Sequence, residues 1–339
     1  MVKKVRTEYL EKLPQWYKNK NAKYQTVLSD DIDGIVSTNI LKQECGWTTE
    51  YFYDFKSLYV SDDFLYAEDK HATRVWADVA FCLRDRDEMG FDNHVSRVNN
   101  DDHMNKLMIN PNLLKEYSVR NKRKDNWFRK GRESRYSIWD YENDRHKLLS
   151  FNYSDPTSEP EYYYYKGVSN QNYYSKYSGS TALLIWSIYK AHQLPSTPLG
   201  KSVLLTIDAA FKGFYSDNES IRATNEDYMT NILGFPELSR MCDTRYPKQN
   251  YYNLIDAHHL TYKISIGEDG YLRTGLDLEW LSNVLEMDIT LPKKHFNKLV
   301  DFNPHGREQF DSISSIMDVG DPVTFAFVGK GVAKYSTLI

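Results

Sequence analysis

The sequence predicts an α/β fold in which a mainly parallel sheet carries helices on both faces. Short apolar segments with strand character alternate with segments of helical periodicity, and this alternation favours parallel strands joined by helical crossovers. An Asp lies at or near the end of four apolar segments, which favours one acidic rim built from several strands. The chain of 339 residues is long enough for a sizeable core and a smaller α+β C-terminal domain.

The first predicted element is a helix. Apolar residues recur at roughly helical spacing in residues 7–19 and predict a short helix packed on the sheet, with a break at Pro14. The apolar run 26–28 predicts the first strand, and residues 49–55 predict the second. An amphipathic segment separates these two strands, as a strand–helix–strand unit requires.

An acidic turn lies between the first strand and this helix, which covers residues 35–41. Asp31 and Asp33 are two residues apart, so both carboxylates can converge on one cation, and Gly34 allows a sharp turn behind them. Hard divalent cations prefer such oxygen ligands. The alternative is that the acids only cap the helix and interact with its positive end.

Two later apolar segments end in polar side chains of the same kind. Asp78 lies inside the buried-strand pattern of residues 74–81, and the next apolar piece ends with Asp92, Asn93 and His94. A carboxylate within an apolar strand costs free energy unless it is paired or binds a metal. We therefore expect these residues to share a site with the acidic turn.

A buried helix and a fourth acid-bearing segment follow. Residues 180–192 predict a largely apolar helix, capped by Ser180 or Gly179, whose positive end could face a phosphate. We therefore assign Ser180 and Thr181 to substrate binding. The next apolar segment predicts a strand that carries Asp208.

In this order the motifs resemble those of the DHH phosphoesterase superfamily, which includes RecJ exonucleases, oligoribonucleases, cyclic-dinucleotide phosphodiesterases and manganese pyrophosphatases. Residues 31–34 match the Asp-x-Asp-Gly turn of that superfamily, and Asp78 matches its second motif, an Asp in an apolar strand. Residues 92–94 match its Asp-His-His motif imperfectly. Asp208 matches its fourth motif, an Asp that follows a helix beginning with Ser-Thr. The resemblance covers about residues 24–215.

The resemblance implies a metal-dependent phosphodiesterase that acts on single-stranded nucleic acid or short oligonucleotides. The implied ligands of one or two manganese (or magnesium) ions are Asp31, Asp33, Asp78 and Asp208. The implied catalytic residues, beside the metal or the scissile phosphate, are Asp92, Asn93 and His94. In such a site the metal polarises a phosphoryl oxygen and lowers the pKa of the attacking water. Cyclic dinucleotides are the alternative substrate.

Two positions depart from the pattern of the superfamily. Many members have a His two residues before the first Asp, where this chain has Ser29. The first His of the third motif is replaced by Asn93, whose amide oxygen binds manganese more weakly than imidazole does. These departures favour an alternative hypothesis, a catalytically retired protein that keeps the fold and binds nucleic acid.

A basic and aromatic segment at residues 118–147 lies inside an insertion at about 100–178. Single-strand-binding grooves use cations that follow phosphates and rings that stack on bases. The residues we assign to substrate binding in this segment are Arg123, Lys124, Trp127, Arg129 and Lys130. The alternative is a solvated surface segment whose aromatic side chains pack into the core.

A change to polar composition near 217–227 predicts a domain boundary. Residues 1–222 then form the metal-binding domain, and residues 223–339 form a smaller domain that caps the substrate. Within the second domain, residues 323–335 predict a β-hairpin that turns at 329–331.

Composition restricts the class of protein. A net charge of -4 gives no overall signature of nucleic-acid binding. Cys45, Cys82 and Cys242 form neither a zinc pattern nor a disulfide framework, so we expect a reducing, cytoplasmic environment. No run of about 20 apolar residues is present, so we expect no membrane-spanning segment.

Overall fold

A computed structural model of the protein describes most of the chain. The described residues are 2–66, 73–81, 88–96, 107–120, 162–166, 168, 173–190, 193–242, 246–310 and 322–339. The side chains assigned to substrate binding in the basic segment lie outside these ranges, and they are Arg123, Lys124, Trp127, Arg129 and Lys130.

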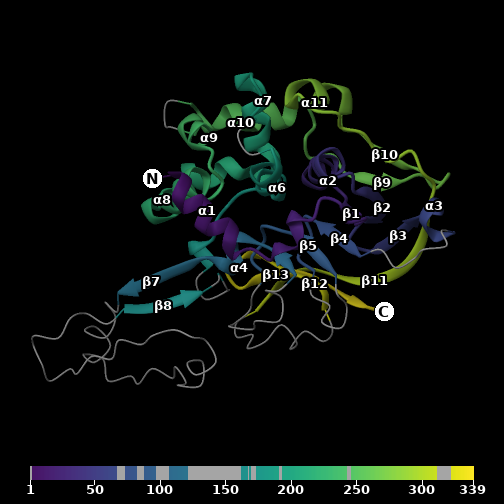
Figure 1. Ribbon diagram of the computed structural model, residues 1–339, viewed down its shortest axis with the longest axis horizontal. Coiled ribbons are helices and arrows are strands. Elements are labelled where there is room, and N and C mark those ends of the chain that lie inside the picture. Colours follow the sequence, from purple (N-terminus) through teal and green to yellow (C-terminus); the bar gives the residue numbers. More distant parts are fainter. Residues whose placement is uncertain are drawn as a thin grey trace, which may run out of the picture.

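Nine of the described strands form one sheet, in the order β12-β13-β11-β3-β2-β1-β4-β5-β6 (Figure 1). Their bounds are β1 Gln25–Ser29, β2 Thr48–Tyr53, β3 Ser57–Ser61, β4 Arg74–Ala77, β5 Met89–Phe91, β6 Met108–Ile109, β11 Phe296–Gln309, β12 Pro322–Gly329 and β13 Val332–Leu338. Two separate antiparallel pairs are formed by β7 Glu116–Arg120 with β8 Tyr162–Lys166 and by β9 Ile264–Ile266 with β10 Leu272–Thr274.

The sheet is mixed, so the prediction of a mainly parallel sheet was wrong. The pairs β2–β1, β1–β4, β4–β5 and β5–β6 are parallel. The pairs β2–β3, β3–β11, β11–β13 and β13–β12 are antiparallel. The connection from β2 to β3 is a tight turn in which the Asp54 carboxylate accepts N–H bonds from Lys56 and Ser57. A turn this short can join only antiparallel strands, because a parallel pair needs a long crossover. An alternation of strand and helix signals does not show which connection is a hairpin.

Most of the described helical elements lie between residues 173 and 285, and the others lie within residues 2–114. Their bounds are α1 Val2–Lys12, η1 Gln15–Lys18, α2 Ile32–Cys45, α3 Asp62–Leu65, α4 Pro111–Leu114, η4 Tyr173–Ser175, α6 Thr181–Tyr189, α7 Pro198–Thr206, η5 Ile207–Tyr215, α8 Glu219–Asp227, η6 Tyr228–Ile232, α9 Pro236–Met241, α10 Lys248–Ala257 and α11 Leu278–Leu285. The predicted break of the N-terminal helix at Pro14 is confirmed, because α1 ends before it and η1 begins after it.

Among the described residues, the longer helices cover one face of the sheet, and the opposite face is contacted by the short helices α3 and α4 (Figure 1). Alternating strand residues such as Leu28, Phe52 and Val75 pack against α2 and α6 in the main core. The residues that alternate with these, such as Trp76, point to the other face of the sheet. They pack in a second core with Phe302 and other residues of the antiparallel strands. The antiparallel half thus curls over the face that a second helical layer would otherwise cover.

The curl brings the last strands of the chain next to the ends of the central ones. The Phe325 N–H donates to the Ala80 carbonyl, 2.9 Å away, and the Phe327 N–H donates to the Val95 carbonyl, 2.8 Å away. The predicted C-terminal hairpin is confirmed as β12 and β13. The segment predicted as a capping domain therefore supplies strands to the same sheet as β1, and the predicted boundary at 222 lies within α8.

The segment predicted as the strand of Asp208 is the helix α7 followed by a kink, so this prediction was wrong. Thr197 caps the helix, because its Oγ accepts the Gly200 N–H at 3.0 Å, and Pro198 occupies the first turn. Val203, Leu204 and Leu205 are all fully buried. Periodicity cannot distinguish a helix buried on all sides from a buried strand.

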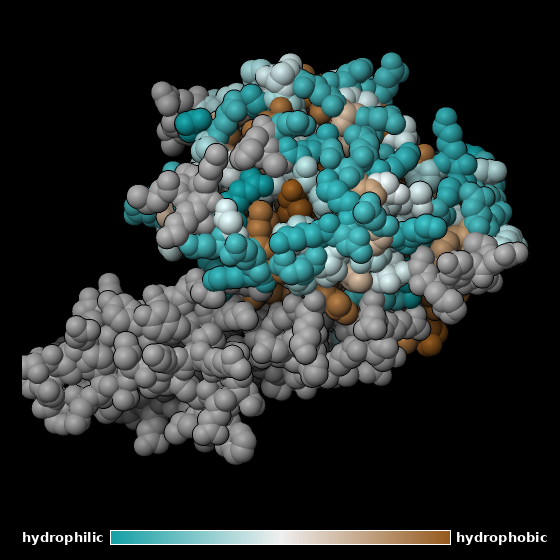
Figure 2. Space-filling model, in the orientation of Figure 1, coloured by the Kyte–Doolittle hydropathy of each residue, from teal (hydrophilic) through white to brown (hydrophobic). Residues whose placement is uncertain are grey.

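The surface side shown in Figure 2 is mainly hydrophilic over the described residues, and hydrophobic residues occupy only small patches there. Within the described part of the chain, no helix is both long enough and apolar enough to cross a lipid bilayer.

Candidate metal centre

The acidic turn after β1 begins the candidate site. Asp31 is the N-cap of α2, because one carboxylate oxygen accepts N–H bonds from Asp33 at 3.0 Å and Gly34 at 3.3 Å. The second Asp31 oxygen contacts the Lys263 ammonium at 3.0 Å. A Cβ at Gly34 would lie 2.1 Å from the Ser29 Oγ, so only glycine allows the turn to approach the strand end this closely. The capping alternative is thus correct for one oxygen of Asp31.

Asp33 is held by the start of a different helix. Its carboxylate accepts the backbone N–H groups of Thr181 at 2.9 Å and Ala182 at 2.6 Å, and the Ser37 hydroxyl at 3.3 Å. The side chain is buried, so the positive end of α6 is its main electrostatic support. Ser180 caps α6 as predicted, since its hydroxyl oxygen accepts the Leu183 N–H. The assignment of Ser180 and Thr181 to substrate binding stays a prediction, and their described hydrogen bonds are to protein groups.

Asp78 and Asp208 occupy strained backbone positions. Asp78 follows β4 with φ of 61°, and Asp208 lies in the kink after α7 with φ of 45°. Residues other than glycine adopt this left-handed region at a cost, and such strain clusters at functional sites. The Asp78 carboxylate accepts hydrogen bonds from the hydroxyls of Thr181 at 3.1 Å and Ser29 at 3.4 Å. Ser29, which replaces the expected His, therefore positions an acid of the site.

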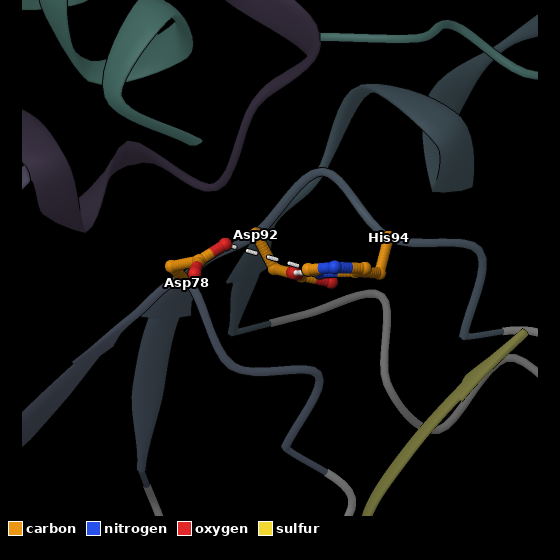
Figure 3. A group of neighbouring side chains, drawn as sticks. All are labelled: Asp78, Asp92 and His94. Atoms are coloured by element: carbon orange, nitrogen blue, oxygen red, sulfur yellow. Dashed lines mark hydrogen bonds and ion pairs between the residues drawn. The ribbon is translucent and has the colours of Figure 1, made fainter. Parts of the chain in front are cut away.

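The loop after β5 contributes Asp92 and His94 (Figure 3). The His94 Nδ1 lies 2.7 Å from one oxygen of the fully buried Asp92 and 4.0 Å from an oxygen of Asp78. Asn110 fixes this loop, since its amide nitrogen donates to the other Asp92 oxygen at 2.9 Å and to the His94 carbonyl at 2.8 Å. Asp78, Asp92 and His94 each offer a ligand atom, and these atoms lie within 4.8 Å of one another.

Asn93 does not join this group. Its amide nitrogen donates to the carbonyl oxygens of Gly179 at 2.8 Å and Tyr177 at 3.3 Å, and its amide oxygen accepts the Tyr228 hydroxyl at 2.9 Å. The buried amide therefore has partners at both ends within the helical side of the core. Neighbouring residues of an extended segment project to opposite sides, so an Asn between Asp92 and His94 is directed away from them.

The charges of the site act strongly on one another. Burial first, and then the charges of neighbouring carboxylates, raise the pKa of Asp33 and of Asp78 well above the usual value. For His94, burial alone would lower the pKa, but the charges of Asp92 and Asp78 raise it well above the usual value. The metal-free site thus has more negative charge than its cations balance, and protons and an imidazolium make up part of the difference.

Asp208 belongs to the same electrostatic group, although it lies on no strand. Burial is the main cause that raises the pKa of Asp208, and the charge of Asp31 adds to this rise. The positive charges of His94, Lys176 and Lys212 oppose it. Asp208 is nevertheless accessible to solvent, and His94 has about a third of its side chain exposed, 32%. The acidic group can therefore be reached from solution, and cationic side chains flank it.

The structure therefore brings together the ligand atoms of Asp78, Asp92 and His94. The charges of Asp31, Asp33 and Asp208 act on this group. Sequence reasoning missed Asn110, which orients Asp92, and Lys263, which pairs with Asp30 and Asp31. Lys263 lies 232 positions from Asp31, so no local motif could reveal it.

Comparison of the chain with family models, with curated proteins and with solved structures found no match in any of the three.

Proposed function

We propose that this protein is a metal-dependent phosphodiesterase that hydrolyses single-stranded nucleic acid or short oligonucleotides. One observation carries the proposal. The loops after β4 and β5 bring ligand atoms of Asp78, Asp92 and His94 within 4.8 Å of one another, and the charges of Asp31, Asp33 and Asp208 act on this group. In an open sheet the carboxyl ends of parallel strands are where ligands bind.

The side chains fit a hard divalent cation. Carboxylate oxygens and an imidazole are donors that manganese accepts, and magnesium accepts the carboxylates. The ligand atoms of Asp78, Asp92 and His94 are close enough to share one ion. Burial, and then the neighbouring carboxylates, raise the pKa of Asp33 and of Asp78 and so disfavour their charged forms. A bound ion would stabilise the charged forms and supply Lewis acidity toward a phosphoryl oxygen.

The surrounding residues hold the acids in place. The start of α6 fixes both oxygens of Asp33, and the hydroxyls of Thr181 and Ser29 fix Asp78. Asn110 fixes Asp92, which in turn orients the His94 ring through Nδ1. Supports of this kind set ligand orientation, and their loss commonly lowers metal affinity or activity 10- to 100-fold, as an order of magnitude.

His94 has the position and charge to act on a leaving oxygen. With Nδ1 bonded to Asp92, the ring keeps Nε2 as the atom that can donate a proton. Where His94 does not ligate the ion, the charges of Asp92 and Asp78, which raise its pKa, favour the protonated ring. A protonated imidazole beside a scissile phosphate stabilises negative charge on the departing oxygen.

The choice of a nucleic-acid substrate follows from the charges around the acids. Lys176 and Lys212 both act on Asp208, so cations border the site on that side. The strands β7 and β8 flank the basic and aromatic segment in the sequence, and that segment supports single strands over pyrophosphate. Cyclic dinucleotides carry the same phosphodiester chemistry and are the alternative substrate.

A second candidate function is favoured by Asn93. Its amide is used entirely by Tyr228 and by backbone carbonyls, so it supplies no ligand in place of the expected imidazole. A site with one ligand fewer fits a protein that binds single strands through the same surface without cleaving them.

The test is manganese-dependent hydrolysis of short single-stranded DNA and RNA and of cyclic dinucleotides. Asp78→Asn is the informative variant, because asparagine tolerates a positive φ and its amide oxygen still accepts one of the two hydroxyl hydrogen bonds, while its amide nitrogen can donate to the other hydroxyl. Asp217→Asn changes an exposed acid nine residues after Asp208 and serves as the control. We expect cleavage that is lost only in Asp78→Asn. Tight binding of single strands without turnover would favour the second candidate.

A further inference from the structure

Lys263 lies at the entrance of the acidic group and pairs with two of its carboxylates. Its Nζ is 2.7 Å from an Asp30 oxygen and 3.0 Å from an Asp31 oxygen. The Lys263 side chain is 55% exposed and that of Asp31 is 30% exposed, so the pair faces solvent on one side. An ammonium has three donors, and these two contacts leave it room for a third acceptor.

These contacts conflict with the role proposed for Asp31. One Asp31 oxygen caps α2, and the other accepts from Lys263, so a cation that bound this second oxygen would lie next to the ammonium. The cap is part of the turn, because it binds the N–H groups of Asp33 and Gly34. The Lys263 contact is a partly exposed ion pair, which is weak in water. Of the two, the contact with Lys263 is the one that a divalent ion can replace.

We propose that Lys263 exchanges partners: it neutralises Asp31 in the metal-free site and binds a phosphate of the substrate once a divalent cation occupies that site. This inference rests on the proposed function, since it concerns the same metal and the same phosphodiester. It adds a residue that lowers metal affinity in the free protein and raises substrate affinity in the loaded one.

The fold allows the side chain to move while its backbone stays in place. The next residue, Ile264, donates its N–H to the Asp30 carbonyl at 2.7 Å, and the Lys263 carbonyl accepts the Thr274 hydroxyl at 3.2 Å. Ile264 itself is buried. The hairpin of β9 and β10 is therefore anchored to the acidic turn by backbone contacts that do not involve the ammonium. After release from Asp31, the ammonium keeps its contact with Asp30, 2.7 Å away, and so stays beside the site with donors left for a phosphate.

Electrostatics sets the expected size of the first effect. A single positive charge about 5 Å from a doubly charged ion disfavours binding of that ion by roughly 1–2 kcal/mol in a water-like dielectric. Removal of the ammonium should therefore strengthen manganese binding by about tenfold, as an order of magnitude. The same removal should weaken the binding of a phosphodiester in the loaded site. One substitution then changes two affinities in opposite directions, which a merely structural ion pair would not do.

The experiment compares wild type, Lys263→Met and a matched control, Lys298→Met. Lys298 is 52% exposed and pairs with Asp301 at 3.1 Å, so the control also removes an exposed, paired lysine. Titration calorimetry with MnCl₂ alone measures metal affinity. Fluorescence anisotropy with a 5′-labelled phosphorothioate pentanucleotide, at saturating Mn²⁺, measures phosphodiester affinity without cleavage.

We expect Lys263→Met to bind Mn²⁺ about tenfold more tightly, and to bind the pentanucleotide severalfold more weakly, than both wild type and Lys298→Met. Unchanged or weaker Mn²⁺ binding would overturn the exchange, and so would tighter Mn²⁺ binding with unchanged pentanucleotide affinity. In both cases wild type still binds Mn²⁺, so the proposed function survives. Absence of Mn²⁺ binding in all three proteins would instead overturn the metal centre and the inference together.

Discussion

The two halves of the sheet treat their carboxylates in opposite ways. At the carboxyl ends of the parallel strands, burial and neighbouring charges raise the pKa of Asp33 and Asp78 well above the usual value. In the antiparallel half, the Ser57 hydroxyl and then Lys298 lower the pKa of Asp301, and the Tyr335 hydroxyl lowers that of Glu308.

Burial explains most of the difference, because Asp33 and Asp78 are buried whereas the side chains of Asp301 and Glu308 are 49% and 44% exposed. Strand direction adds to it. Parallel strands collect all their carboxyl ends at one edge, so acids that follow them are forced together. Antiparallel strands send alternate ends to opposite edges, so each acid can find its own partner. The parallel half therefore gathers carboxylates whose charges are not fully balanced, whereas in the antiparallel half each carboxylate has its own partner and the strands serve mainly for packing.

The largest effect should come from removing an acid of the parallel half. We expect Asp78→Asn to reduce manganese-dependent hydrolysis by at least about a thousandfold, because it removes a ligand from the metal group. Asp301→Asn, in the antiparallel half, should leave the rate within about twofold of wild type. Steady-state kinetics on the same oligonucleotide would compare the two. Equal losses in both variants would show that the halves do not differ in this way.

A core substitution in the antiparallel half should have the reverse profile. Phe325 is fully buried, so Phe325→Ala should lower the free energy of unfolding by about 3–5 kcal/mol. Manganese affinity of the folded protein should fall far less, because the ligands lie on other strands. Urea denaturation and calorimetry measure the two quantities separately. A loss of metal affinity as large as in Asp78→Asn would mean that β12 sets the geometry of the site directly.

A smaller effect is expected from the support of Asp92. Asn110→Ala removes the hydrogen bonds to the Asp92 carboxylate and the His94 carbonyl without touching a proposed ligand. We expect metal affinity or activity to fall about 10- to 100-fold. If the loop is only a structural element, stability will fall while metal affinity and the pH dependence of the rate stay as in wild type.

The smallest effect concerns stability and pH. The pKa of Asp78 is raised by folding, so the metal-free folded state loses stability as pH rises above the unfolded value of about 4. Asp78→Asn removes this penalty. The variant should therefore be as stable as wild type near pH 4 and more stable by about 1–2 kcal/mol at pH 8, without metal. Thermal unfolding of both proteins in a chelator across this pH range measures the sign of their difference in stability. A wild-type stability that rises relative to that of the variant as pH increases would contradict the prediction.

The sequence was most informative about the local chemistry of the parallel half. The turn at residues 31–34, Asp78 and residues 92–94 each follow or end a strand as predicted, because apolar strand signals are short and local. The curl of the sheet could not be predicted in this way. It depends on the pairing of β3 with β11, whose register joins Val60 to Asn297 across most of the chain.

Where prediction of the site was incomplete, the missing information was long-range contact. Asn93 occupies the position of an expected ligand, and only the fold shows that Tyr228 and Gly179 use its amide. Lys263 carries no motif and becomes informative only when β9 is placed beside the acidic turn. Asp208 was predicted on a strand and lies in the kink after α7, since a buried helix end and a buried strand have similar apolar patterns.

The most direct test of the metal centre is direct binding of Mn²⁺, measured by electron paramagnetic resonance of the free ion. Wild type, Asp78→Asn and Asp301→Asn should be compared at pH 7.5, where deprotonation favours binding. We predict saturable binding of one or two ions by wild type and Asp301→Asn, and a loss of at least one ion in Asp78→Asn. Equal binding by all three proteins, or no saturable binding by wild type, would contradict the assignment of this acidic group as a metal centre.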